Sequence, residues 1–150
     1  MNYNKDFRFN VFEKASIARN FEEEVIINVR NKNIKIPVYV SAGQEFIAST
    51  IATICKLKKI TPLIFGQHRC HSTYLTFGGD KGKLIDELLE KKSGCTKGMG
   101  GSASIHSKKI NMFGHDGLMG SNGPIGVGAC YATKKPTIIF LGDASAEEDY

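Results

Sequence analysis

The sequence predicts an α/β fold in which helices cover a parallel sheet. Apolar residues recur at intervals of three and four over residues 7–30, as on one face of a helix. Two short apolar runs, at residues 63–65 and from Thr137 onward, have the composition of buried parallel strands. The resulting order, helix, strand, helix, glycine-rich loop, helix and strand, is typical of parallel layered structures.

Composition indicates an ordinary globular protein. The 150 residues are 41% hydrophobic and 23% charged, which suits a single domain. The formal charge of +5 is mild, and the lysine pairs are scattered rather than clustered with aromatics, so we expect no nucleic-acid partner. No apolar run approaches the roughly 20 residues of a membrane span, and the N-terminus lacks the apolar core of a signal peptide. We therefore expect a cytoplasmic protein with no membrane association.

The four cysteines predict free thiols. Cys55, Cys70, Cys95 and Cys130 are too widely spaced for a C-x-x-C zinc or redox motif. Reduced cysteines in a reducing compartment are the simplest interpretation.

The first 60 residues predict two helices. The first has an apolar face formed by Val11, Ala15, Ala18, Phe21, Val25 and Val29. Its run Glu22–Glu24 is expected to face water in part. The second is expected to start at Ser41, with Gln44 as a capping-box partner. It is apolar nearly all round, which predicts deep burial.

A third helix is expected after Asp80, a favourable N-cap residue, with Gly94 as its terminator. Its buried stripe would consist of Leu84, Ile85, Leu88 and Leu89. Residues 93–128 are so rich in glycine that we expect a long loop without regular structure, of a kind that is usually functional. Pro124 then predicts a short helix packed closely on the sheet.

The end of the second strand predicts a metal site. Residues 137–145 read Thr-Ile-Ile-Phe-Leu-Gly-Asp-Ala-Ser, so Asp143 follows the strand directly. Ligands bind at the carboxyl ends of strands in open α/β sheets. Mg²⁺ prefers few protein carboxylates combined with ligand phosphates. Asp143 is therefore a candidate magnesium ligand beside a phosphorylated cofactor.

His68, Arg69, Cys70 and His71 follow the first strand, and parallel strands would bring them to the same rim as Asp143. Arg69 offers a planar cationic fork suited to a diphosphate. Ordinary structural roles and metal binding are the alternatives for this cluster, although a closed zinc site needs four ligands.

The glycine loop offers two further interpretations. Backbone N–H groups of Gly98–Ser102 could cradle a phosphate or simply form a turn, and neither a Walker A nor a Rossmann signature is present. His106 and His115 lie in the same loop, where a histidine is structural unless a cofactor lies beside it.

Together these segments resemble the α subunit of thiamine diphosphate-dependent 2-oxo acid dehydrogenases, the E1α family of pyruvate, branched-chain and acetoin dehydrogenases. The similarity runs from about Ala15 to the C-terminus. It rests on Arg19-Asn-Phe21-Glu22, Gly43-Gln44-Glu45, Arg69-x-His71, the loop from Gly94 to Ser102, Gly117-Leu-Met-Gly120 with Pro124 and Gly128, and Gly142-Asp143, in that order.

The resemblance implies an incomplete thiamine diphosphate-binding fold: the first half of a three-layer parallel sheet, with residues 1–40 as an N-terminal helix and loop and 41–150 as the α/β portion. It implies thiamine diphosphate and Mg²⁺ as cofactors, with Asp143 as the metal ligand. The implied cofactor contacts are His68, Arg69, Gly117, Leu118, Met119, Gly142, Asp143, Ala144 and Ser145. The implied catalytic residues are His106 and His71, and Ser104 competes with His106 for the family's loop-histidine position.

The resemblance also implies oxidative decarboxylation of a small 2-oxo acid, with acyl transfer to a lipoyl group or another acceptor. Its implied partners are an E1β-type subunit in a heterotetramer, which supplies the glutamate that activates the cofactor, and a lipoyl-bearing acyltransferase. The chain alone would then be inactive.

The sequence departs from the family pattern at several positions. His68 replaces a tyrosine, Asn122 replaces a glutamine, and Ala144 replaces a glycine. If position 144 needs a positive φ, alanine there costs roughly 1 kcal/mol. The family's second metal ligand lies one crossover beyond Asp143, and only seven residues follow Asp143 here. We therefore expect exposed apolar sheet edges and helix faces unless another part of the subunit or a partner covers them.

The sequence is also compatible with two other functions. A non-catalytic assembly or regulatory module would retain half of the fold without the chemistry. A generic nucleotide-binding α/β domain is disfavoured because the Walker and Rossmann signatures are absent.

Overall fold

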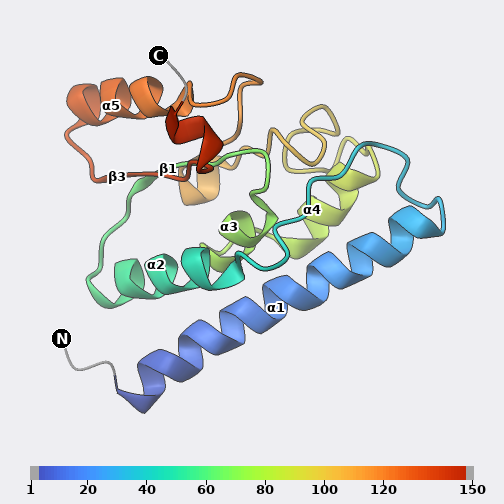
Figure 1. Cartoon of the computed structure of the whole chain (residues 1–150), viewed down its shortest axis with the longest axis horizontal. Coiled ribbons are helices and arrows are strands. Elements are labelled where there is room, and N and C mark those ends of the chain that lie inside the picture. The colour runs from blue at the N-terminus through green and yellow to red at the C-terminus, as the bar shows by residue number, and fades with distance from the viewer. Residues whose placement is uncertain (1–3, 148–150) are drawn as a thin grey trace.

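A computed structural model describes residues 4–147 of the chain (Figure 1). Its elements are α1 (Lys5–Arg30), α2 (Glu45–Leu57), β1 (Leu63–Phe65), α3 (His71–Thr76), α4 (Lys81–Leu88), the 3-10 turn η1 (Lys108–Ile110), β2 (Met112–Phe113), α5 (Asn122–Thr133), β3 (Thr137–Ile139) and the 3-10 turn η2 (Ala144–Glu147). No helix within residues 4–147 has the length and apolar character needed to cross a bilayer.

The strands form a parallel sheet in the order β2-β1-β3. Ile64 of β1 pairs with Met112 on one side and with Ile138 on the other. Helix α5 lies on one side of the sheet, and α2 and α3 lie on the other, with α1 running beneath them (Figure 1). The predicted α/β class with helices on both faces of a parallel sheet is therefore confirmed.

Helix α1 begins two residues before the predicted range, and Asn4 caps it by accepting a hydrogen bond from the N–H of Phe7 at 3.0 Å. The predicted apolar face is buried from Val11 to Val25. Val29 was assigned to this face incorrectly, since it is 38% exposed near the helix end. The prediction for Glu22 was also wrong: its side chain is fully buried because polar partners surround it.

Helix α2 begins later and is less deeply buried than the sequence predicted. It begins at Glu45, and Gln44 makes no side-chain capping bond. Ser41 does not start the helix, because its hydroxyl is hydrogen-bonded to the Glu22 carboxylate at 2.5 Å. Phe46 and Ile47 are 55% and 59% exposed, so α2 buries one face rather than its whole circumference.

Helix α4 confirms the predicted cap, since the Asp80 carboxylate accepts from the N–H of Lys83 at 3.0 Å. Leu84 and Leu88 are buried as expected. Ile85 and Leu89 are 38% and 36% exposed, and the helix ends at Leu88, well before Gly94. The buried stripe is therefore narrower than predicted.

The glycine-rich stretch is folded around one buried carboxylate. Glu87, at the end of α4, has no exposed surface, and its Oε2 accepts from the N–H groups of Thr96 at 2.7 Å and Gly98 at 3.0 Å. Its Oε1 accepts from Gly100 at 2.8 Å and Gly101 at 3.1 Å. These N–H groups hold an internal carboxylate, so the interpretation of the loop as a turn is favoured over a phosphate cradle.

The loop is also more regular than expected. Strand β2 and the turn η1 lie within residues 93–128, where the sequence predicted no regular structure. Strand β2 is only two residues long, and the hydrogen bonds to β1, not its own sequence, define it.

Helix α5 packs closely on the sheet, as predicted from Pro124 in its first turn. Gly126 makes this possible, because a Cβ at that position would lie 2.6 Å from the Ile139 side chain. The opposite face of α5 is open to solvent, with Val127 and Tyr131 65% and 77% exposed. This exposure, together with that of Phe46 and Ile47 on α2, confirms the expected apolar helix faces. All four cysteines are free thiols, as predicted.

Replacing Glu87 with glutamine tests whether this carboxylate organises the loop. An amide nitrogen cannot accept, so two of the four backbone N–H groups would lose their acceptor, at about 1–3 kcal/mol for each buried group. We expect a lower free energy of unfolding in urea and faster hydrogen exchange at residues 96–101. Glu90→Gln, an exposed change three residues away, is the control and should leave both measurements unchanged. Equal protection of the loop in the two variants would contradict the assignment.

Candidate functional site

A cavity of about 230 Å³ lies where β1 and β3 end. Its polar lining comes from Gln44, Gln67, Arg69, Ser72, Thr73 and Asp143, and its apolar lining from Ile47, Ala48, Phe140 and Leu141, with Gly142 beside Asp143. Because the strands are parallel, the segments after both of them reach the same rim. The predicted placement of Arg69 at the same rim as Asp143 is confirmed, whereas Cys70 and His71 are buried and do not line the cavity.

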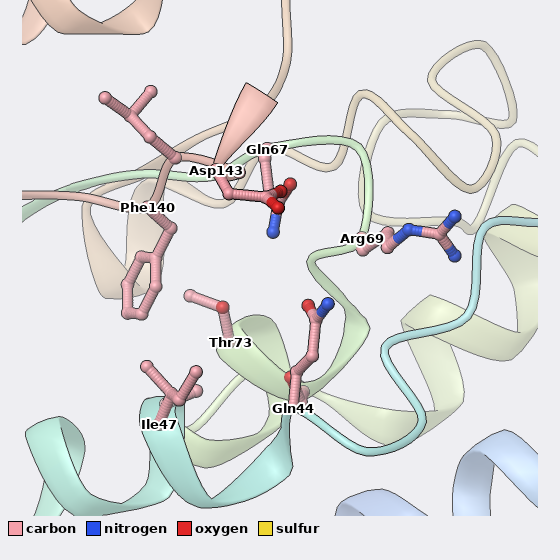
Figure 2. Close-up of a pocket in the computed structure, with 11 residues that line it drawn as sticks. Gln44, Ile47, Gln67, Arg69, Thr73, Phe140 and Asp143 are labelled. Atoms are coloured by element: carbon pink, nitrogen blue, oxygen red, sulfur yellow. The ribbon is translucent and has the colours of Figure 1, made fainter. Parts of the chain in front are cut away.

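Asp143 and Gln67 both point into the cavity (Figure 2). Gln67 is the second residue after β1, and its Oε1 would lie 3.5 Å from a Cβ placed on Gly142. This brings an amide close to the segment that carries the candidate metal ligand. Carboxylate and amide oxygens are both suitable ligands for Mg²⁺.

Arg69 lies at the edge of the cavity with its guanidinium directed away from Asp143 (Figure 2). Its Nη1 donates to the carbonyl of Val40 at 3.1 Å, and the side chain is otherwise exposed. The guanidinium has further N–H donors, so Arg69 can bind an anion at the cavity mouth while it keeps the Val40 contact.

A smaller hollow of about 10 Å³ adjoins the cavity and shares Gln67, Phe140 and Leu141 with it. It is lined by four of the predicted cofactor contacts, His68, Leu118, Met119 and Ser145. The Ser145 hydroxyl lies 3.9 Å from the Met119 sulfur, which links η2 to the loop before α5. The structure therefore gathers most of the predicted cofactor residues along one continuous rim.

His68 lies between two aromatic rings, with centroid distances of 5.4 Å to Tyr39 and 5.7 Å to His115. Burial lowers the pKa of His68, and the positive charges of Arg69 and His115 lower it further. His68 therefore favours the neutral imidazole, which donates to or accepts from a ligand without carrying a charge.

Two predicted contacts do not line either hollow. Gly117 lies in the preceding loop with a φ of +109°, a conformation that favours glycine. Ala144 begins η2 and is not among the residues with positive φ, so the strain considered for alanine at this position is absent.

His71 lies in the core, although the resemblance assigned it a catalytic role. The residue is fully buried, with Nδ1 2.9 Å from Glu22 Oε2 and Nε2 2.9 Å from Ser102 Oγ. An acid, a histidine and a serine are thus connected as in a catalytic triad. Ser102 is itself buried, accepts from the N–H of Tyr39 at 2.8 Å, and lines none of the cavities described here. This arrangement acts as a structural link between segments.

The two candidates for the loop position lie next to each other. Ser104 Oγ donates to the carbonyl of His115 at 2.7 Å and lies 3.2 Å from His106 Nε2. Neither Ser104 nor His106 lines the cavity at the strand ends. The catalytic roles of His71 and His106 stay predictions.

A metal at this rim would have Asp143 as its one carboxylate among the residues that line the cavity. Within the described part of the chain, no three His, Cys, Asp or Glu side chains converge as a metal site. The metal interpretation of the His68–His71 cluster therefore has no support, since His71 points to Glu22 instead.

Sequence reasoning missed Gln67 and Thr73 as cavity residues. The position of Gln67 directly after β1 was an available signal, because strand-end residues line the rim. Thr73 lies on α3, a six-residue helix for which the sequence carried no recognisable capping signal.

Comparison with known proteins places this geometry in a family. The model of the dehydrogenase E1 component family matches residues 13–149. The pyruvate dehydrogenase E1 component subunit alpha-1 of Oryza sativa is 30% identical over 91% of this chain and 36% of its own length. The corresponding alpha subunit of Schizosaccharomyces pombe is 32% identical over 92% of this chain and 34% of its own length. The alpha subunit of the acetoin:2,6-dichlorophenolindophenol oxidoreductase of Cupriavidus necator is 28% identical over 96% of this chain and 44% of its own length. The chain thus spans less than half the length of these relatives.

The environment of His68 predicts its titration. Removing the neighbouring positive charge with Arg69→Gln should raise the pKa of His68 toward its ordinary value, because a nearby cation disfavours the imidazolium. NMR titration of the imidazole carbons measures this directly, and Arg30→Gln, at the exposed end of α1, is the control. An unchanged or lower pKa in Arg69→Gln would contradict the proposed coupling.

The environment of Glu22 predicts acid sensitivity. Burial alone would raise the pKa of Glu22, but hydrogen bonds from His71 and Ser41 outweigh it and hold the pKa below its ordinary value. Its stabilising contribution is therefore complete above the unfolded-state pKa and is lost as the pH falls through the folded-state pKa. Glu22→Gln should lower the free energy of unfolding by about 3–5 kcal/mol at neutral pH and reduce its loss in acid. The measurement is urea unfolding across pH. Glu23→Gln, its exposed neighbour, should behave like the unmodified chain, and a similar behaviour of Glu22→Gln would refute the prediction.

Proposed function

The chain belongs to the dehydrogenase E1 component family, and from this premise we propose that it forms part of a thiamine diphosphate-binding α subunit. The supporting observation is the cavity at the carboxyl ends of β1 and β3, where Asp143, Gln67 and Arg69 meet. An acid, an amide and a cation at one rim match the needs of a diphosphate bound with a divalent metal ion.

The residues present fit the cofactor in their chemistry. Asp143 would ligate Mg²⁺, and Arg69 would contact the diphosphate at the mouth of the cavity. Ser72 and Thr73 line its floor and bear hydroxyl groups. Ile47 and Phe140 contribute apolar side chains to the lining.

The hollow beside His68, at about 10 Å³, holds no more than about one water molecule, so we propose that its lining residues border the cofactor and do not enclose it. Leu118 and Met119 would contact its ring, with Gly117 shaping the loop that carries them. Ala144 and Ser145 would lie beside the diphosphate. His68, which favours its neutral form, would donate a hydrogen bond to a phosphate oxygen or accept one from a protonated group.

The chemistry that thiamine diphosphate supplies when bound is a carbon nucleophile for the carbonyl of a 2-oxo acid, which allows loss of carbon dioxide and transfer of the acyl group. A lipoyl group carried by an acyltransferase, or another acceptor, would take that group. An E1β-type subunit would complete the active site in a cytoplasmic heterotetramer. The role of this chain is to bind and orient the cofactor.

A non-catalytic module is the second candidate, and one observation favours it. Asp143 is the one carboxylate among the residues that line the cavity, and the side chain is exposed. A chain of this kind would retain the assembly surface of an α subunit without holding the cofactor.

Calorimetric titration of thiamine diphosphate in the presence of Mg²⁺, with the β-type partner present, separates the two candidates. We expect saturable binding that weakens at least about tenfold, or about 1.4 kcal/mol, in Asp143→Asn, because an amide carries no charge to offer the metal. Asp6→Asn, in the first turn of α1 and far from the cavity, is the control. Binding that is equal in the two variants would contradict the role of Asp143. No binding by the unmodified complex would favour the module.

A further inference from the structure

A second cavity, of about 290 Å³, lies at the opposite ends of the strands. Thr61 and Pro62, which precede β1, and Ile110, which precedes β2, form part of its wall. Asp143 follows the other end of the sheet, so this cavity is separate from the site proposed above.

Three lysines from three different elements line this cavity. Lys14 comes from α1, Lys56 from the last turn of α2 and Lys109 from η1. No aspartate or glutamate is among the lining residues, although the exposed Glu13 adjoins Lys14 in the sequence. Three lysines and no acid thus line the cavity, which gives its wall a net positive charge.

Lys14 is half-buried, whereas Lys56 and Lys109 are exposed. Its Nζ donates to the carbonyl of Thr76 at 3.0 Å, which fixes the ammonium beside the end of α3 and leaves further N–H donors. Burial lowers the pKa of Lys14, and the charge of Lys56 lowers it further, whereas Glu13 opposes these effects. A negative charge bound beside Lys14 would favour the charged ammonium and so oppose both of these effects on its pKa.

Much of the remaining wall is apolar, and Thr61 and Thr76 are its polar side chains. Cys55 of α2, Ile64 of β1 and Phe77 after α3 belong to it, and Cys55 and Ile64 are buried. Apolar walls with a few charged groups are typical of sites for small organic ligands. Inorganic phosphate has no apolar part that could contact these side chains.

We propose that this cavity binds a small amphipathic carboxylate, with the carboxylate held by Lys14, Lys56 and Lys109 and a short apolar chain packed against Ile64 and Phe77. This site is independent of the proposed cofactor site, so a negative result here leaves the thiamine diphosphate proposal untouched.

The test uses hexanoate, hexan-1-ol and inorganic phosphate as probes in calorimetric titrations of the protein. We expect saturable hexanoate binding that weakens with salt, and at least about tenfold weaker binding of the alcohol and of phosphate. No saturable binding of hexanoate, or equal binding of hexanoate and hexan-1-ol, would overturn the proposal. Equal binding of hexanoate and phosphate would also overturn it.

Charge variants locate the site. Lys56→Gln combined with Lys109→Gln changes two exposed lysines of the cavity and should weaken hexanoate binding at least about tenfold. Lys35→Gln combined with Lys92→Gln changes two exposed lysines elsewhere and should leave binding unchanged. An equal effect of the two pairs would show a general charge effect and refute the site.

Thiol chemistry gives a readout that does not depend on lysine substitution. Cys55 lines the cavity, whereas Cys130 lies on α5, outside it. Burial raises the pKa of the Cys55 thiol, so the alkylation by iodoacetamide is followed by mass spectrometry at alkaline pH, where hexanoate should slow it at Cys55 and leave that of Cys130 unchanged. Equal rates at Cys55 with and without hexanoate would contradict binding in this cavity.

Discussion

The hydrogen bonds of the buried Glu22 carboxylate determine how the segment before α2, the start of α3 and the glycine loop are arranged around α1. Its Oε1 accepts from the backbone N–H of Ser41 at 2.8 Å and from the Ser41 hydroxyl, and its Oε2 contacts His71. His71 in turn contacts Ser102. One side chain of α1 thus fixes the segment before α2, the start of α3 and the glycine loop. A buried charge is tolerated only with such partners, so these segments must adopt their positions together.

A second buried carboxylate, that of Glu87, occupies N–H groups of the glycine loop that could otherwise bind phosphate. Glycine-rich loops often bind phosphate through their N–H groups. Here Glu87 accepts from four such groups, so the loop is already organised around a negative charge that belongs to the protein. These four N–H groups are therefore not free for a phosphorylated ligand, which agrees with the cofactor site proposed at the strand ends with Arg69 and Asp143. The N–H groups of the loop that bind Glu87 and the cavity at the strand ends are thus separate parts of the molecule.

The sequence predicted those features that depend on contacts between residues close together in the chain. The β-branched run at 137–139, the cap at Asp80 and the position of Asp143 after its strand depend on neighbouring residues. The burial of Glu22 and Glu87 was not predictable, because their partners lie up to 49 residues away, as for Glu22 and His71. The contact of Glu45 was not predictable for the same reason, because its partner lies far away in the sequence. Glu45 accepts two hydrogen bonds from Arg19 of α1, at 2.6 and 3.2 Å. The motif residues Arg19, Glu22, Glu45 and His71 were recognisable as a pattern, but the contacts between them were not.

The strand that leads to Asp143, β3, lies at an edge of the described sheet. Strand β3 pairs with β1 alone among the described strands, and its three residues are half-buried. The N–H of Phe140 donates to the carbonyl of Phe65 at 2.9 Å, and Ile139 contacts Gly126 of α5, so β1 and α5 hold the segment that leads to Asp143. Helix α5 itself exposes Ile125, Val127 and Tyr131. Helix α5 therefore lies between β3, which leads to Asp143, and an exposed apolar face.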